Sequence, residues 1–135
     1  MEQRSLVPSI CPYCGVGCGL YLRVNDGILT GIEYMSEHPV NQGALCPKGN
    51  ACLDIVYHRE RILYPMKKVG GRFERTTWDD ALDLVAENLS RVCSVQGPNA
   101  LGFLASAKAT NEDNYLLQKF ARLLGTNNID QCARL

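Results

Sequence analysis

The sequence predicts an α+β fold, with a small antiparallel β subdomain followed by the first, incomplete part of a layered α/β domain. In the first part, an alternating apolar segment at 20–24 and a second segment at 28–34 flank Asn25-Asp26-Gly27, which is a hairpin turn signal. From Thr77 onward, the apolar spacing changes to that of a helix, a short apolar strand and a second helix. This order is typical of the start of an α/β domain.

A cysteine-rich segment at 11–19 immediately precedes the first of these strands, so we expect the small sheet to carry this loop at one end. An irregular loop that starts at His38 leads to Cys46. Beyond it, the apolar spacing from Gly49 to Val56 fits a short helix. The same spacing places Cys52 on the apolar face of that helix, as a packing residue.

In the second part, residues 66–75 are predicted to form another hairpin, with Gly70-Gly71 as its turn. Thr77 is expected to cap the following helix, with Asp80 in the reciprocal position of a capping box, and Gly97-Pro98 is expected to end it. The helix face predicted to be buried comprises Trp78, Ala81, Leu82, Val85, Ala86, Leu89 and Cys93.

Residues 100–105 form a nearly unbroken apolar run, which is typical of a strand buried on both faces of a parallel sheet. Thr110 is expected to cap the next helix, with Asp113 at the box position, and Gly125 is expected to close it. The predicted buried stripe of this helix comprises Leu116, Phe120, Leu123 and Leu124.

One strand and two helices do not complete an α/β domain. We therefore place a first domain at 1–65 and the start of a second domain at 66–135, and we expect the second to be truncated. Partly bare apolar faces and open sheet edges are the expected consequence.

The composition narrows the class of protein. The 14 basic and 14 acidic residues cancel, which gives no indication of a nucleic-acid partner. No apolar run approaches the length of a membrane span, and the N-terminus lacks the basic and apolar regions of a signal peptide. We therefore predict a cytoplasmic protein without a membrane segment. Seven cysteines in a reducing compartment indicate metal binding rather than disulfides.

Four of these cysteines form the candidate site. Cys11, Cys14 and Cys18 have the spacing C-x2-C-x3-C in a glycine-rich loop, and Cys46 follows on a distant loop. Four thiolates in this three-plus-one arrangement suit a [4Fe–4S] cluster. Zinc is the main alternative, although structural zinc sites usually have two short cysteine pairs, and disulfides or plain buried thiols are the weakest alternative.

The remaining cysteines and the histidines are interpreted as structural. Cys93 lies on an apolar helix face and is expected to pack in the core. His38 and His58 are lone histidines in polar loops, so we expect them to be solvated rather than to bind a metal.

Three motifs resemble the N-terminal part of the large, alpha subunit of the molybdenum- or tungsten-dependent bis-pterin oxidoreductases, and within them formate dehydrogenase. The first motif is Cys11–Cys18 together with Cys46-Pro47-Lys48-Gly49. The second is 77–82, and the third comprises several short segments within 114–134. The likeness extends from about Ile10 to Leu135.

The resemblance implies that the complete enzyme oxidises formate to carbon dioxide, or runs the reverse reaction. It implies a [4Fe–4S] cluster bound by the four cysteines, and molybdenum or tungsten bound by bis-molybdopterin guanine dinucleotide in the full-length protein. Lys48 matches the family lysine that lies between cluster and pterin as an electron relay. A partner subunit with iron–sulfur clusters or a flavin is implied as the recipient of the electrons.

The same resemblance places the protein ligand of the metal, a cysteine or selenocysteine, directly after Leu135. Because selenocysteine is encoded by UGA, we expect a truncated product, or a wrongly assigned reading frame, that ends at such a codon and is inactive alone. A fragment boundary that was set deliberately is the alternative. Cys132 is then a neighbour of the ligand position, and Arg134 lies near the active centre. A fragment of nitrate reductase and a free-standing iron–sulfur electron carrier remain the alternative functions.

Overall fold

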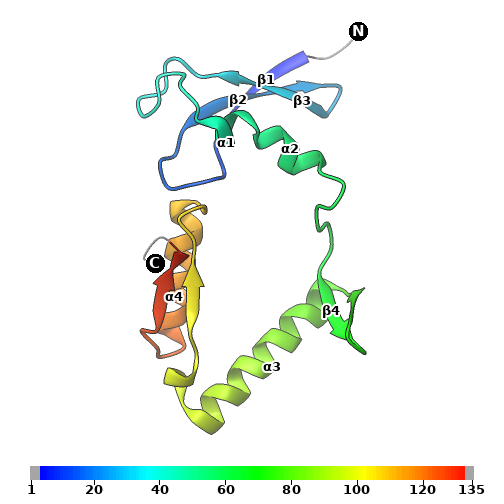
Figure 1. Ribbon diagram of the computed structural model, residues 1–135, viewed down its shortest axis with the longest axis vertical. Coiled ribbons are helices and arrows are strands. Elements are labelled where there is room, and N and C mark those ends of the chain that lie inside the picture. Colours follow the sequence, from blue (N-terminus) through cyan, green and yellow to red (C-terminus); the bar gives the residue numbers. More distant parts are fainter. Residues whose placement is uncertain (1–3, 133–135) are drawn as a thin grey trace. The chain divides into compact units, whose positions relative to one another are not determined.

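The computed structural model describes residues 4–132, which form two compact units (Figure 1). The first unit comprises the described residues up to Arg61 together with Ser106–Tyr115. The second comprises Ile62–Ala105 together with the described residues from Leu116 onward. Antiparallel strands at the N-terminus followed by α/β elements confirm the predicted fold class, whereas the predicted domain boundary after residue 65 stays a prediction.

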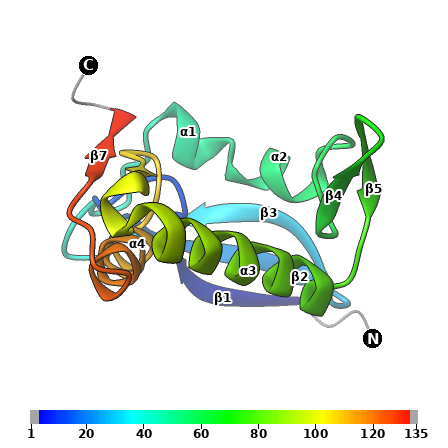
Figure 2. The same cartoon turned by 90° about the horizontal axis from the view of Figure 1, so that it is seen from below.

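The first unit is built on a three-stranded antiparallel sheet in the order β1-β2-β3. Its strands are β1 (Arg4–Ile10), β2 (Gly19–Asn25) and β3 (Ile28–Tyr34) (Figure 2). Asp26 and Gly27 adopt φ values of 48° and 79°, as a two-residue hairpin turn requires, so the predicted hairpin is confirmed. The sequence did not predict β1. This strand lies at the edge of the sheet, where a proline such as Pro8 is tolerated because no further strand pairs with that side.

Two short helices follow the loop after β3. They are α1 (Pro47–Asn50) and α2 (Cys52–Tyr57), in place of the single helix predicted from Gly49 onward. The prediction that Cys52 packs inward is confirmed, because the residue is only 7% exposed. The main buried cluster of this unit comprises Cys11, Leu20 and Cys52, with Tyr13, Cys18, Leu22, Ile32 and Leu45 packed against them, and Met35 is buried as well.

The second unit begins with the hairpin of β4 (Met66–Val69) and β5 (Arg72–Arg75), whose turn glycines have φ values of 54° and 86°. Helix α3 (Trp78–Gln96) follows, and the Thr77 hydroxyl accepts a 3.1 Å hydrogen bond from the Asp80 N–H. Gly97, at φ 81°, ends the helix. The hairpin, the cap and the helix end therefore agree with the sequence-based expectations.

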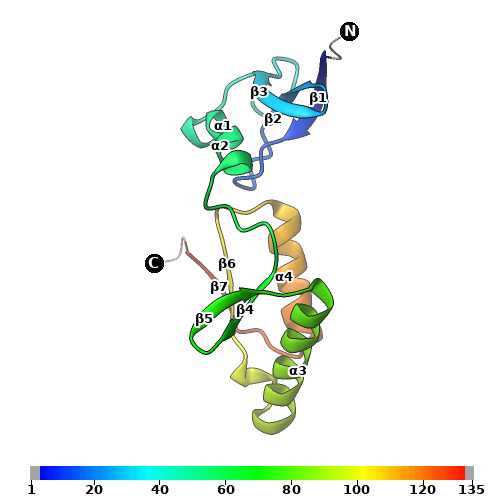
Figure 3. The same ribbon diagram turned by 90° about the vertical axis from the view of Figure 1, so that its right-hand side faces the viewer.

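A short parallel sheet completes the described chain. After the 3₁₀ turn Pro98–Ala100, strand β6 (Phe103–Ala105) pairs with β7 (Ile129–Gln131), and helix α4 (Asn111–Leu123) connects them (Figure 3). The rings of Phe103 and Phe120 pack edge to face with centroids 5.9 Å apart. The predicted second capping box forms, because the Thr110 hydroxyl accepts from the Asp113 N–H at 3.2 Å and the Asp113 carboxylate accepts from the Thr110 N–H at 3.2 Å. Strand β7 was not predicted.

In the described residues, the predicted burial of the apolar helix stripes is wrong, whereas the expectation of partly bare apolar faces is confirmed. Helix α3 has no buried residue and its Trp78 is 68% exposed, while Leu123 of α4 is 77% exposed. Leu104 of β6 is 82% exposed, so the expectation of a strand buried on both faces is also wrong. Spacing predicts that a face is apolar, but burial needs a second layer, and none of the described segments covers these faces. The buried residues of this unit are Leu101, Ala121 and Thr126 instead. None of the described helices combines the length and apolar character that crossing a membrane requires.

Candidate metal centre

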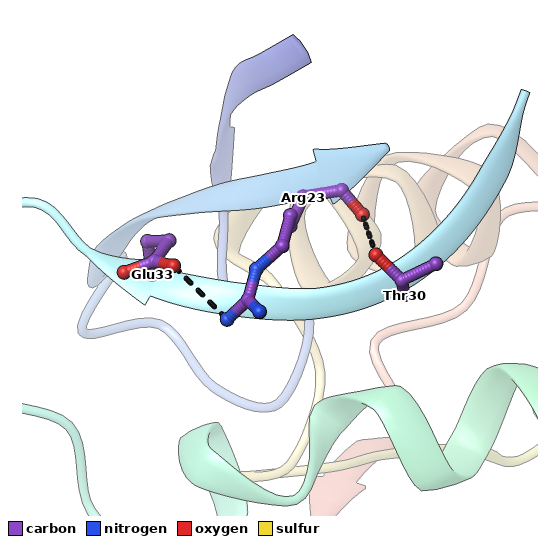
Figure 4. A network of polar contacts seen from close by, with 3 residues as sticks. All are labelled: Arg23, Thr30 and Glu33. Atoms are coloured by element: carbon purple, nitrogen blue, oxygen red, sulfur yellow. Dashed lines mark hydrogen bonds and ion pairs between the residues drawn. The ribbon is translucent and has the colours of Figure 1, made fainter. Parts of the chain in front are cut away.

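The three-stranded sheet holds the cysteine loop 11–18 between the end of β1 and the start of β2. Polar contacts stiffen this sheet, since Arg23 forms a 2.9 Å ion pair with Glu33 and its carbonyl accepts from the Thr30 hydroxyl at 3.2 Å (Figure 4). The antiparallel register of β1 and β2, which ends with the pair Ile10 and Gly19, determines where the loop leaves and re-enters the sheet.

The loop is closed at its base by a backbone hydrogen bond. The Cys11 N–H donates to the Cys18 carbonyl at 2.8 Å, directly beyond the paired residues Ile10 and Gly19. The first and third cysteines are thus held at opposite sides of the loop entrance. Gly17, at φ 71°, makes the turn inside the loop that a residue with a side chain would disfavour.

Cys46 enters the site from the N-terminus of α1, with Pro47 as the first helical residue. The backbone N–H of Gly49, followed by that of Lys48, holds the pKa of the Cys46 thiol below its usual value, and the Lys48 charge acts in the same direction. A thiolate is the form that binds a metal ion, so the local fold prepares Cys46 as a ligand.

Cys11, Cys14 and Cys46 lie within electrostatic range of Cys18. Burial, followed by the charges of Cys11, Cys14 and Cys46, raises the pKa of the Cys18 thiol. A Cβ atom on Gly49 would approach the Cys11 sulfur at 3.7 Å, so the two ligand-bearing segments also meet there. Thiolates that repel one another in this way favour a bound cation, and the donor set fits an iron–sulfur cluster.

In the described part of the chain, no three His, Cys, Asp or Glu side chains are close enough together to form a metal-binding group as they stand. The four cysteines therefore lie in neighbouring segments, but their sulfur atoms are not at the separation that ligands of one metal centre require. The assignment of the four ligands, and the role of exposed Lys48, stay predictions.

The remaining cysteines differ from this set. Cys52 packs in the core, and burial, followed by the charge of Cys11, raises its thiol pKa and favours the neutral form. Cys93 is half-buried on α3, and Cys132 is exposed. Ala133, Arg134 and Leu135, which end the third sequence motif, lie outside the described residues.

The loop that delivers Cys46 is tied to the sheet by side chains that sequence reasoning missed. The Tyr21 hydroxyl donates to the Glu37 carboxylate, and the Tyr34 hydroxyl donates to Asn50 Oδ1 at 2.7 Å. Asn50 in turn donates to the Cys46 carbonyl at 3.2 Å. No local pattern marks these residues, because their partners are distant in sequence.

His38 is half-buried in this loop, so the expectation of a solvated side chain is wrong. Its Nδ1 accepts from the Gly19 N–H at 3.3 Å, and a Cβ on Gly19 would lie 2.3 Å from the ring. The residue after Cys18 is thereby restricted to glycine. His58 is exposed and accepts from the N–H of Glu60.

A further contact reaches the cysteine loop from the start of α4. Asn111 Nδ2 donates to the Gly15 carbonyl at 2.9 Å, within the first unit. A Cβ on Gly15 would lie 2.4 Å from Asn111 Oδ1, so this glycine is needed for the approach of a side chain.

Comparison with known proteins identifies the family of this arrangement. Residues 5–58 match the model of the molybdopterin oxidoreductase Fe4S4 domain, and residues 61–135 match that of the molybdopterin oxidoreductase domain. The chain is 51% identical to the F420-dependent formate dehydrogenase subunit alpha of Methanocaldococcus jannaschii, over 98% of this chain and 19% of that protein. It is 45% identical to the F420-dependent formate dehydrogenase 2 subunit alpha of Methanococcus maripaludis, over 100% of this chain and 20% of that protein.

Among solved structures, acetylene hydratase from Pelobacter acetylenicus matches 92% of this chain and 18% of its own, with a TM-score of 0.73 and 32% identity. The chain spans about a fifth of the length of the curated relatives named above. The two family models confirm the predicted [4Fe–4S] cluster and molybdopterin as the cofactors. The chain belongs to the molybdopterin oxidoreductase family.

Proposed function

We propose that this chain is the cluster-binding part of a formate dehydrogenase alpha subunit, which oxidises formate to carbon dioxide and releases one proton and two electrons. The observation that carries the proposal is the identity of 45–51% with alpha subunits of formate dehydrogenases over essentially all of this chain. Because the chain spans about a fifth of those proteins, the activity is proposed for the longer polypeptide, and we expect no formate turnover from these 135 residues alone.

The proposed ligands of the [4Fe–4S] cluster are Cys11, Cys14, Cys18 and Cys46. The cluster, when bound, supplies transfer of single electrons at a potential set by its surroundings. The chain's own contribution is to present the thiolates. Backbone N–H groups stabilise the thiolate of Cys46. Burial, followed by the charges of the other three cysteines, raises the pKa of the Cys18 thiol, so a bound cation would be needed to stabilise its thiolate.

Lys48 is proposed as the cationic residue between the cluster and the pterin. Its charge already acts on the Cys46 thiolate, which supports a position beside the cluster. A cation there favours the more negative, reduced state of a neighbouring redox group. Replacement by glutamine is expected to lower the cluster potential while the iron content stays unchanged.

The electron recipient is proposed to be a partner subunit that contains iron–sulfur clusters or a flavin. The similar proteins are named as alpha subunits, which supports a multi-subunit assembly, and their names make coenzyme F420 the first terminal acceptor to test. The expected cytoplasmic location and the expected selenocysteine after Leu135 stay predictions. The codon that follows the Leu135 codon tests the latter.

The deciding experiment uses the full chain with its downstream polypeptide, purified without oxygen. We expect about four irons and four sulfides per chain, as a [4Fe–4S] cluster requires, and formate-dependent reduction of a one-electron dye. Cys46→Ala is expected to lose cluster iron, whereas the matched variant Cys52→Ala is expected to retain it. Zinc in place of iron would refute the cluster assignment.

The reaction itself needs a separate test, because similar folds in this family support different chemistries, as the similarity to acetylene hydratase illustrates. An iron-loaded protein that leaves formate unchanged but exchanges electrons reversibly would favour the alternative of an electron carrier. Reduction of nitrate in place of oxidation of formate would favour the nitrate reductase alternative.

A further inference from the structure

Asn41 lies in the loop between β3 and α1, and its side-chain amide contacts both cysteine-bearing segments. Its Oδ1 accepts a 2.8 Å hydrogen bond from the N–H of Gly19, the residue after Cys18. Its Nδ2 donates to the Gly19 carbonyl at 3.0 Å and to the Ala44 carbonyl at 2.9 Å. Ala44 precedes Cys46 by two positions. One half-buried side chain therefore bridges the backbone next to the third cysteine and the backbone next to the fourth.

The amide of Asn41 uses both of its N–H donors and its oxygen in these bonds, so its orientation is determined. The backbone reinforces the contact, because the Ala44 N–H donates to the Asn41 carbonyl at 2.7 Å. On the other side, His38 Nδ1 also accepts from the Gly19 N–H. The peptide groups on either side of Gly19 are thus held on the same loop that leads to Cys46.

Packing alone gives this region little rigidity. The buried cluster beside the cysteine loop comprises Cys11, Leu20 and Cys52, Met35 is buried separately, and Cys46 is exposed. Because the core is small, the spacing of the surface loops depends more on directional contacts, and in this region these are hydrogen bonds to backbone groups. The bridge through Asn41 is therefore one of the contacts that set the separation between Cys18 and Cys46, beside the hydrogen bonds of His38 and Asn50.

We propose that Asn41 is a positioning residue for the metal centre, which sets the place of Cys18 relative to Cys46. This inference rests on the proposed cluster. It assigns to an uncharged side chain, which itself binds no metal, the task of holding two ligand segments at the separation that one cluster spans.

The test compares Asn41→Asp and Asn41→Leu with wild type in the full chain. Aspartate has the size of asparagine and still accepts from the Gly19 N–H, but it offers no N–H to either carbonyl. Leucine removes every bond of the side chain. The matched control is Asn114→Asp, because Asn114 is also half-buried and its Nδ2 donates to the carbonyls of Ser106 and Thr110 at 3.1 and 3.0 Å. No hydrogen bond described for Asn114 involves a cysteine-bearing segment.

Iron release to a chelator is measured on the cluster-loaded proteins. We expect Asn41→Asp to release iron about thirtyfold faster than wild type, which corresponds to about 2 kcal/mol at 1.4 kcal/mol per factor of ten. Asn114→Asp is expected to lower the thermal unfolding midpoint about as much as Asn41→Asp does, while its iron release stays within about twofold of wild type. Equal rates for Asn41→Asp and wild type, or equal acceleration in Asn41→Asp and Asn114→Asp, would overturn the inference.

A second readout does not involve the cluster. In the metal-free full chain, the Gly19 amide is expected to exchange its hydrogen faster in Asn41→Leu than in Asn41→Asp, which keeps the acceptor. Identical exchange in the two variants would also count against the bridge. If wild type binds no iron, the proposed cluster fails, while this exchange measurement still decides whether Asn41 holds the two segments.

Discussion

Replacing Gly15 by alanine is expected to destabilise the cysteine loop only while Asn111 is present. The Asn111 amide donates to the Gly15 carbonyl at 2.9 Å, across 96 positions of sequence. A Cβ on residue 15 would lie 2.4 Å from Asn111 Oδ1 and 3.2 Å from its Cγ. The first separation is shorter than any real contact of a Cβ atom, so alanine and the present rotamer of Asn111 exclude each other.

The magnitude depends on which side gives way. If Asn111 rotates away, the fold loses one hydrogen bond, worth about 1 kcal/mol. If the loop moves instead, overpacking costs about 1–3 kcal/mol. Gly15 has no positive φ, so alanine adds no backbone strain, and it stabilises by about 0.4–1 kcal/mol through the unfolded chain. Gly15→Ala should therefore be destabilising beside Asn111, and neutral or stabilising in an Asn111→Ala background.

A double-mutant cycle measured by urea unfolding of the anaerobic full chain tests this reversal. The expected coupling free energy is at least about 1 kcal/mol, well above the scatter of independent sites. Gly17→Ala serves as the control, because Gly17 has φ 71° and no neighbouring atom within 4 Å, so its cost should be the same with and without Asn111. If Gly15→Ala costs the same in both backgrounds, the contact does not determine the glycine and the reasoning is refuted.

Three further outcomes are expected. Thr77→Ala should lower the stability of the second unit by about 1 kcal/mol in thermal unfolding, because the Asp80 N–H loses its cap; an unchanged midpoint would contradict this. Hydrogen bonds from the hydroxyls of Thr77 and then Thr76 hold the pKa of Asp80 below its usual range. The ionised carboxylate therefore stabilises the fold above the ordinary carboxyl pKa, and this contribution is lost as the pH falls through the lowered pKa; Asp80→Asn should remove that part of the acid sensitivity in unfolding curves. Anaerobic removal of iron should increase amide hydrogen exchange in 11–19 while exchange within α3 stays unchanged, and equal effects on both would argue against a local site.

The parts of the fold that were predicted from sequence are those whose partners lie within a few residues. The turn at Asp26-Gly27 is determined by two backbone conformations that few residue types adopt. The caps at Thr77 and Thr110 satisfy N–H groups three residues further along the chain. Gly97 ends α3 for a similarly local reason. Each signal is complete within a short window, so it can be recognised without knowledge of the tertiary structure.

Elements that depend on distant partners were missed. Strand β7 has one apolar residue in three and exists because β6 offers a parallel edge some 25 residues earlier, Phe103 pairing with Ile129. Asn41 and Asn111 look like ordinary loop and helix-start residues, yet their amides bond to backbone groups 22 and 96 positions away. Their roles follow from geometry alone, which no periodicity or composition encodes.

The cysteine spacing was informative about chemistry but not about what holds the cysteines in place. Burial, followed by the charges of Cys11, Cys14 and Cys46, raises the pKa of the Cys18 thiol, so forming several thiolates close to one another costs free energy. The buried cluster beside the cysteine loop, which comprises Cys11, Leu20 and Cys52, is small, so burial offers little to offset that cost. Directional bonds from neutral amides can resist the repulsion without adding charge or competing for the metal. This accounts physically for asparagine, rather than a charged or apolar residue, at the junction of the two ligand segments.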